Sequence, residues 1–228
     1  MTITQMKYSH YAYVGLFGVT LGSRIHDLGV SNYSISLTRR VDGGPIAGRA
    51  GNGTVIERCS VSGSIRIDAY GAGDIFVGGI LGRAYTATIK DCVVAGSVYA
   101  SNDNTSSIVY AGGVLGYAHT ATVSNCLVTS SARAYCYTSI AVAGGIVGCA
   151  ETSTAILSSV VTGSGEAYGR DGTHVGKYLA YNRASSYYSN CHSSLGTTLD
   201  FYISTLGWSG SVWSFDGVES GAQPTLKK

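Results

Sequence analysis

Apolar and polar residues alternate along most of the chain in short runs. Within residues 88–100, Cys92 and Val94 alternate with polar or small neighbours, and so do Val98 and Ala100. A period of two residues is the signature of a β-strand, and the many Ile, Val, Thr and Tyr residues agree with it. No helical period of convincing length appears. The pattern therefore predicts an all-β chain built from short strands.

The alternating runs belong to a longer unit that recurs about every 30 to 34 residues. Each copy has a glycine-aliphatic segment, a polar turn, and then a segment of the form aliphatic-x-polar-Cys-x-Val. Clear copies occupy residues 44–61, 79–94, 112–128 and 144–161, a fainter copy occupies 15–30, and a decayed copy occupies 175–193. A repeat of this length indicates a solenoid, a propeller or an array.

In each copy the alternation slips by one residue just before the Cys position. Residues with short polar side chains favour tight turns because they can bond their own backbone. We therefore expect a corner of the fold at the equivalent positions, which are Asp27, Arg58, Asp91, Asn125, Ser158 and Asn190.

Stacking is the natural arrangement for such units. A single unit cannot bury its aliphatic face, whereas units stacked at the strand spacing of about 4.8 Å can. Equivalent residues then form columns, and Glu57 lies beside Lys90 as Arg58 lies beside Asp91. The sequence predicts a β-solenoid of about six coils over residues 15–196, with an entry strand or cap at 1–14. A propeller is the alternative, since its blades have a similar period.

The repeat is lost after Thr197, where both tryptophans of the chain, Trp208 and Trp213, occur. Solenoid ends expose core residues and free strand edges, so terminal segments usually cap them. We expect residues 197–228 to form a C-terminal capping segment that folds over the last coil. Trp213 or Phe215 would cover its aliphatic interior.

Four of the cysteines share one position of the repeat, where the other copies have Leu28 and Ser159. A position that accepts Leu, Cys and Ser is a small buried site, and an unbonded Cys packs there as a small hydrophobe. We therefore expect a structural core column of reduced thiols, formed by Cys59, Cys92, Cys126 and Cys191. Cys136 and Cys149 lie outside this column, and the pattern leaves their redox state open.

The composition narrows the classes of partner. Charged residues are 12% of the chain, against about 25% in an average protein, while there are 32 Gly and 17 Tyr. The net charge is +2 and basic residues are not clustered, which argues against nucleic acid as a partner. No segment reaches the roughly 18 apolar residues that a membrane helix needs. We expect an extracellular or cell-surface protein, represented by a fragment of a larger precursor because its N-terminus has no signal-peptide core.

The units resemble the GLUG-motif repeat of bacterial cell-surface proteins. That pattern is close to GGLVG followed by a turn and I-x-N-C. Here GGILG at 78–82, GGVLG at 112–116 and GGIVG at 144–148 match the first half, and VSNC at 123–126 matches the second. The resemblance covers nearly the whole chain and departs from the pattern at Pro45 and at 175–177. It implies a secreted or surface-anchored, adhesin-like protein and no catalytic residues.

The residues themselves suggest little enzymatic chemistry. Glycosidases need two carboxyl groups about 5 to 9.5 Å apart. Asp68, Asp74 and Asp103 lie in or near the variable edge loops, where solvated turn residues are the simpler interpretation. The five His show no metal-ligand spacing, and no phosphate loop or nucleophile elbow is present. We predict no catalytic residue, no metal site and no cofactor.

The tyrosines are the best candidates for binding, because Tyr offers an apolar ring and a hydroxyl group. Several lie in turns and loop flanks among Ser, Thr and Asn. The alternative is that they only cover coil edges. The candidate binding residues are Tyr85, Tyr99, Tyr110, Tyr117, Tyr135 and Tyr137, with Tyr168 in a similar setting.

These observations favour a non-catalytic stalk or adhesive surface that binds glycan or protein by many weak contacts. Two alternatives remain open at the level of the sequence. One is a β-helical carbohydrate-active enzyme or a phage tail-spike-like protein. The other is a subunit of a self-assembling filament, because the ends of a solenoid are unpaired strand edges.

Overall fold

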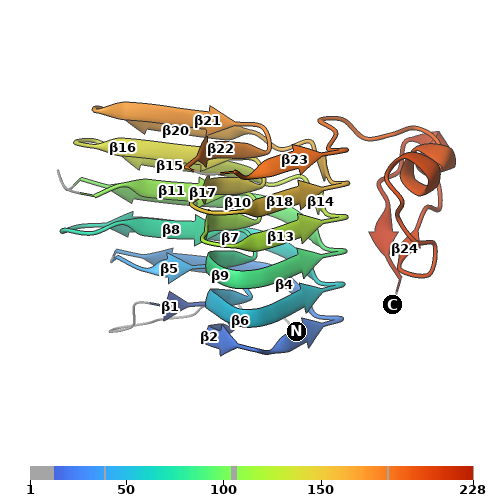
Figure 1. Ribbon diagram of the computed structural model, residues 1–228, viewed down its shortest axis with the longest axis horizontal. Coiled ribbons are helices and arrows are strands. Elements are labelled where there is room, and N and C mark those ends of the chain that lie inside the picture. Colours follow the sequence, from blue (N-terminus) through green and yellow to red (C-terminus); the bar gives the residue numbers. More distant parts are fainter. Residues whose placement is uncertain (1–12, 39, 104–106, 184, 228) are drawn as a thin grey trace.

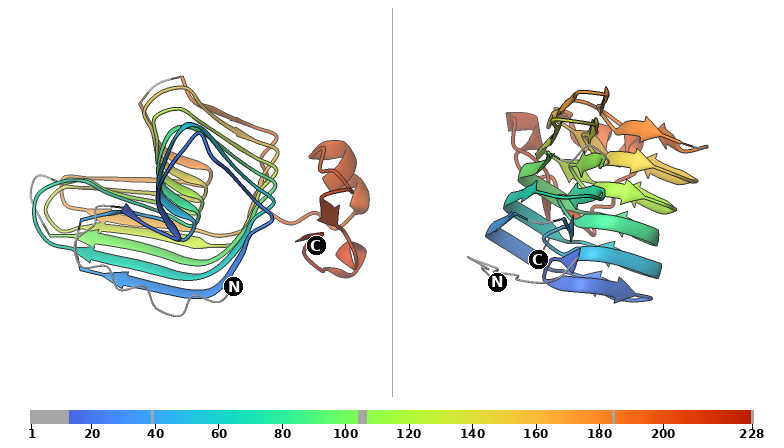
Figure 2. Two further views of the ribbon diagram at one scale, coloured as in Figure 1. Left: turned by 90° about the horizontal axis from the view of Figure 1, so that it is seen from below. Right: turned by 90° about the vertical axis from the view of Figure 1, so that its left-hand side faces the viewer.

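The computed structural model describes residues 13–38, 40–103, 107–183 and 185–227. Nearly all of its elements are short strands, which pair in parallel and wind into a β-solenoid (Figure 1). Sheets A, B and C run along the stack, as the view along its axis shows (Figure 2). The prediction of a β-solenoid is confirmed, and the repeat glycines lie in a stack rather than around the ring of a propeller.

In the part of the chain that the structure describes, sheet B has six strands, one from each coil. In spatial order they are β1 (Tyr13–Val14), β5 (Asp42–Gly43), β8 (Ile75–Gly78), β11 (Val109–Gly112), β16 (Ile140–Gly144) and β21 (Gly172–Gly176). Of the expected N-terminal entry strand at 1–14, the described residues contain only β1.

Each coil passes from sheet B into sheet C and then into sheet A. Sheet C contains β2 (Phe17–Leu21), β3 (Arg24–His26), β6 (Ala47–Glu57), β9 (Leu81–Lys90), β12 (Leu115–Ala118), β13 (Ala121–Ser124), β17 (Val147–Ala150), β18 (Thr154–Leu157), β22 (Leu179–Asn182) and β23 (Tyr187–Ser189). Sheet A contains β4 (Gly29–Leu37), β7 (Ser60–Ala69), β10 (Val93–Asn102), β14 (Leu127–Val128), β15 (Ser131–Cys136), β19 (Val160–Val161) and β20 (Gly165–Gly169). Within the described residues, the sixth coil reaches sheet A only through the single bridge from Val160 to His192.

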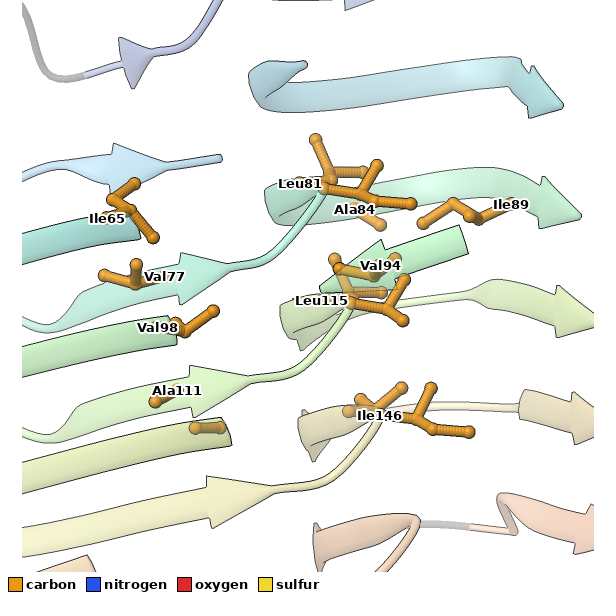
Figure 3. Packing of buried hydrophobic residues seen from close by; sticks show 14 of the residues in the cluster. Ile65, Val77, Leu81, Ala84, Ile89, Val94, Val98, Ala111, Leu115 and Ile146 are labelled. Atoms are coloured by element: carbon orange, nitrogen blue, oxygen red, sulfur yellow. The ribbon is translucent and has the colours of Figure 1, made fainter. Parts of the chain in front are cut away.

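Equivalent residues of successive coils pair in register, so the sequence repeat becomes columns of side chains. Ile56, Ile89, Val123 and Ile156 follow one another in sheet C, and all four are fully buried. Figure 3 shows the interior that such columns fill, with residues such as Val77, Leu81 and Val98 pointing into the space between the sheets. Hydrophobic burial along these columns is what stabilises one coil on the next.

The corner expected before the Cys position is present in every coil. Its six residues have positive φ angles between 46° and 54°, in the left-handed region. Asn, Asp and Ser tolerate this region better than bulkier residues because their short side chains can bond nearby groups. The Asn125 amide, for example, donates to Asp91 Oδ1 of the preceding coil at 3.1 Å. The one-residue slip in the alternation of apolar and polar residues is therefore caused by this turn.

Charged pairs link the corners of neighbouring coils. Lys90 Nζ lies 3.0 Å from Glu57 Oε2, as the alignment of the repeats predicts. Arg58 bonds Asp27 of the preceding coil, with Nε 2.6 Å from Oδ1, rather than Asp91 of the following coil. Asp91 accepts a hydrogen bond from Asn125 of the coil that follows it.

The thiol column also lies where the repeat places it. Cys59, Cys92 and Cys126 are fully buried at the corner of successive coils, and Cys191 is partly buried in the last one. All six cysteines are free thiols, including Cys136 and Cys149. Burial raises the pKa of Cys92 well above its ordinary value, because the thiolate would lose its hydration.

These thiols should react slowly with labelling reagents. We expect native protein to take up a maleimide mainly at Cys191, and to label at all six sites only after denaturation. Mass spectrometry of the labelled peptides would measure this. Rapid labelling of Cys59, Cys92 or Cys126 in the native protein would contradict the buried column.

The C-terminal segment packs beside the solenoid, at the right in Figure 1, rather than over its last coil. It contains the π-helix η1 (Phe201–Thr205), the 3-10 helix η2 (Val218–Ser220), and strands β24 (Trp213–Ser214) and β25 (Thr225–Leu226), which pair antiparallel. The prediction that Trp213 or Phe215 covers the interior of the last coil is wrong, because both residues pack in the cluster on the flank.

The tail covers the flank because apolar side chains lie there. Leu127 and Val160 begin their strands of sheet A with side chains outside the solenoid, and they form one buried cluster with Trp208 and Trp213. The end of the stack is less well covered. Val175 is paired with the interior residue Ala143, yet 53% of its surface is exposed.

Candidate functional site

The outer face of sheet A brings together several of the candidate tyrosines. Ile65, Val98 and Ala132 point into the core, so the alternate residues of the same strands point outward. Two outward columns run side by side along the stack. We call them the tyrosine face, which consists of Arg66, Tyr99, Arg133 and Glu166 in one column and Asp68, Ser101, Tyr135 and Tyr168 in the other.

Ring contacts hold the centre of the tyrosine face. The rings of Tyr99 and Tyr135 stack with their centroids 5.5 Å apart and their planes 27° apart. The guanidinium of Arg66 lies 4.1 Å from the centroid of the Tyr99 ring. Such ring–ring and cation–π contacts fix the side chains in place, so less conformational entropy is lost when a ligand binds.

Ion pairs neutralise the charges of the face. Arg66 Nε is 2.5 Å from Asp68 Oδ2, and Asp68 Oδ1 accepts a hydrogen bond from Ser101 at 2.8 Å. Arg133 and Glu166 pair in the same way, at 3.0 Å. The result is a surface of rings, hydroxyls and paired charges with no net charge.

The phenol of Tyr135 is tied into this network. Its hydroxyl donates to Glu166 Oε1 at 2.7 Å. The hydrogen bond to a carboxylate raises the pKa of Tyr135, because a phenolate could no longer donate and would be repelled. Tyr135 therefore stays a neutral hydroxyl group, available to a polar ligand.

A small pocket of about 200 Å³ opens at the edge of the tyrosine face. Pockets for drug-sized ligands are larger, about 300 to 1,000 Å³, so this one suits a single projecting group of a larger ligand. Among its lining residues, Tyr70 and Tyr137 are 65% and 58% exposed. The pocket is lined by Arg66, Asp68, Ala69, Tyr70, Tyr99, Ser101, Asn102, Asp103 and Tyr137.

The other candidate tyrosines lie elsewhere. Tyr85 is half-buried on sheet C, where its ring stacks on His119 at 5.6 Å. Tyr110 and Tyr117 are only 1% and 8% exposed, so their prediction as surface binding residues is wrong. They belong to a second apolar cluster with Phe76, Val142 and Cys149.

This second cluster fills the angle between sheets B and C. The ring of Phe76 stacks on Tyr110 with centroids 5.0 Å apart, and Tyr117 meets Phe76 edge-on at 4.9 Å. These residues point away from the solenoid interior, but the two sheets meet so closely that each covers the outer side chains of the other. The alternation of apolar and polar residues along one strand cannot predict this burial, because the burial depends on the angle between two strands.

A buried carboxyl group lies in the same angle. Asp42 is 6% exposed and accepts a hydrogen bond from Arg83 Nη2 at 3.1 Å. The Arg83 guanidinium lies 3.8 Å from the Phe76 centroid. Burial raises the pKa of Asp42 to about 6, since the loss of hydration outweighs the attraction of Arg83 and its neighbours.

The raised pKa predicts how stability depends on pH. The unfolded chain releases the Asp42 proton near pH 3.8 and the folded chain near pH 6, so the folded state binds the proton more tightly between these values. The Asp42 contribution to stability is therefore lost as pH rises through this window, by about 3 kcal/mol in all. Urea titrations should show the free energy of unfolding of the wild type falling between pH 4 and 7, and Asp42→Asn should make this fall smaller. A variant with the same pH profile as the wild type would contradict the assignment.

The carboxylates near the edge loops have structural partners. Asp68 belongs to the tyrosine face, and Asp74 Oδ1 accepts a hydrogen bond from the Ile108 backbone N–H at 2.8 Å. Within the described residues, no group of three or more His, Cys, Asp and Glu side chains could hold a metal ion. The same residues contain no helix long and apolar enough to span a membrane.

The sequence did not single out several residues of the tyrosine face. Arg66, Arg133 and Glu166 appear in it as isolated charges, and Tyr70 lies in a variable loop. An alignment of the repeats could have found the charged ones, because Arg66, Arg133 and Glu166 all occupy the repeat position of Tyr99.

Comparison with known proteins shows the fold and no family. No family model matches the chain, and no curated protein matches it. Among solved structures, the chain resembles one described as a putative immunoglobulin A1 protease from Bacteroides ovatus. The two are 17% identical with a TM-score of 0.61, and the likeness covers 99% of this chain and 74% of the other. At this identity the likeness shows that the two proteins share a β-solenoid fold.

Proposed function

We propose that this chain is a non-catalytic, ligand-binding segment of a secreted or surface-anchored bacterial protein. Its tyrosine face would bind glycan, or protein as the alternative ligand, by several weak contacts along a rigid stack. The observation that carries the proposal is the ladder of Arg66, Tyr99 and Tyr135, with exposed tyrosines at its edge. We also propose that its units are of the GLUG type, on the strength of the glycine and VSNC motifs.

The chemistry of the face favours a sugar as ligand. Tyr rings offer flat apolar surfaces that pack on the C–H face of a sugar ring. The oxygens of Asp68, Ser101 and Tyr135 offer acceptors beside the rings, since both hydroxyl protons are already donated to carboxylates. The face is electrically neutral, so it would not select a ligand by charge alone. Repeats of the same positions in successive coils would let one chain contact several sugar units.

The alternative is a carbohydrate-active enzyme. The name of the structural neighbour suggests a third activity, proteolysis, but the shared fold alone carries no catalytic role to this chain. Both activities need reacting groups in a cleft. The tyrosine face instead pairs each carboxylate with an arginine.

A glycan array with a paired-variant control tests the proposal. We expect saturable binding to at least one glycan class without its hydrolysis. The double variant Tyr70→Ala, Tyr137→Ala should weaken this binding at least tenfold, about 1.4 kcal/mol. The control is Tyr187→Ala, Tyr188→Ala, because these residues are 57% and 56% exposed on sheet C.

Three results would count against this function. They are the absence of binding to any glycan, equal losses in both double variants, and release of cleaved sugar by the wild type. Binding to proteins but not glycans, lost in the first variant only, would assign the same face to a protein ligand.

A further inference from the structure

A second cavity lies between the tail and the first coils of the solenoid. It arises from one outward column at the start of sheet A, whose residues are Gly29, Ser60, Val93, Leu127, Val160 and His192 in successive coils. The tail packs tightly on the large apolar residues, Leu127 and Val160. At Gly29 and Ser60 the column has almost no side chain, so the tail stands over empty space.

This space measures about 610 Å³, within the range of about 300 to 1,000 Å³ typical of small-molecule sites. The solenoid contributes Leu28 and Val93 to its wall, and the tail contributes Pro224 and Leu226. Most of the lining surface is apolar, although Ser60, Gln223 and Thr225 also contribute to it, and none of the lining residues has an aromatic ring. Such a wall suits a flexible hydrocarbon chain better than a sugar or an aromatic ligand.

Charged side chains complete the lining. They are Arg58, Lys227 and Asp27, so two cations face one carboxylate. Asp27 is already neutralised, because Arg58 donates to both of its oxygens at 2.6 and 2.8 Å. Lys227 is exposed and lines the same cavity, so its ammonium favours an anionic group on the ligand.

We propose that this cavity binds a single-chain amphiphile with a carboxylate head, of the fatty-acid class. The hydrocarbon chain would lie between Leu28 and Val93 on one side and Pro224 and Leu226 on the other. The carboxylate would lie near Lys227. The site is separate from the tyrosine face, so the two proposals fail or hold independently.

Dodecanoate is a suitable probe, used below its micelle concentration in isothermal titration calorimetry. We expect saturable binding of one molecule per chain. Ser60→Val should weaken it at least tenfold, because valine continues the apolar column and fills the cavity. Lys227→Gln should weaken dodecanoate several-fold and leave dodecanol binding unchanged.

Two controls separate cavity filling from damage to the fold. Ser97→Val changes an exposed serine of sheet A outside the cavity and should bind dodecanoate like the wild type. Ser60→Val should melt at the wild-type temperature or above it. Glycan binding by the tyrosine face should be the same in all these variants.

The proposal is overturned if dodecanoate does not bind saturably, or if Ser60→Val binds it as well as the wild type. It also fails if the wild type binds only phospholipid vesicles, which would indicate a membrane surface site. If Ser60→Val does not fold, the Lys227→Gln variant tests the proposal on its own. Its affinity for dodecanoate relative to dodecanol should be lower than that of the wild type. Equal selectivity in that variant and the wild type would then contradict the proposal.

Discussion

Replacing Gly112 by alanine should destabilise the solenoid by more than about 3 kcal/mol, enough to unfold much of the protein at 37 °C. Gly112 ends β11, where the chain turns sharply from sheet B into sheet C. An added Cβ would lie 2.7 Å from the Leu115 carbonyl carbon, closer still to its oxygen, and 2.9 Å from the Gly148 backbone nitrogen. All of these are backbone atoms of packed strands, which cannot move aside cheaply. Urea denaturation followed by circular dichroism would measure the loss.

Gly172→Ala is the matched control, because Gly172 lies in β21 of the same sheet. Its added Cβ would meet only side-chain atoms of Ile140, at 3.5 Å or more. We expect this variant to stay within about 0.5 kcal/mol of the wild type or to gain stability. If Gly112→Ala were as stable as Gly172→Ala, the close approach of coils at the glycine turn would be wrong.

The second large effect concerns the tail. Trp208 is 1% exposed, stacks on Trp213 with centroids 4.2 Å apart, and donates its indole N–H to the Ser158 carbonyl at 2.7 Å. Truncating such a residue to alanine costs about 3 to 5 kcal/mol. The cluster that holds the tail is small, so we expect Trp208→Ala to release residues 197–228 while the solenoid stays folded.

Limited proteolysis would show this release directly. Trp208→Ala should be cut rapidly near residue 197, leaving a resistant solenoid fragment, and the emission of the remaining Trp213 should shift to the red. Leu199→Ala is the control, since Leu199 belongs to the same tail but is 42% exposed. Resistance of Trp208→Ala to cleavage, or unfolding of tail and solenoid together, would contradict independent docking of the tail.

The solenoid itself could be predicted from the sequence because its coils stack in register. A period along the chain then becomes a column in space, so the shared position of Cys59, Cys92 and Cys126 led to a buried thiol column. The phase slip at Asp91 and its equivalents led to the corner for the same reason. The repeat pattern was sufficient to predict the position of a residue wherever its contacts are the same in each coil.

The sequence could not predict contacts between elements that do not repeat. Tyr110 and Tyr117 point outward from their own strands, and only the angle between sheets B and C buries them. The tail was expected at the end of the stack because the end exposes the core. The apolar residues Leu127 and Val160 on the flank attract it instead, and their outward orientation follows from the corner geometry.

Part of the tyrosine face could be predicted from the sequence, since Tyr99 and Tyr135 were among the candidate binding residues, as was Tyr137 of the adjoining pocket. Its arginines were not, because a charged residue on a strand usually marks only a solvated surface. Arg66 gains its role from the Tyr99 ring, which comes from the next coil, 33 residues later in the chain.

The most direct test of the account is hydrogen–deuterium exchange with and without a bound glycan from the array. We predict slower exchange confined to β7, β10, β15 and β20 and to the loops that contain Tyr70 and Tyr137, because these carry the tyrosine face and its pocket. Protection centred on sheet C or on the tail, with sheet A unchanged, would contradict it.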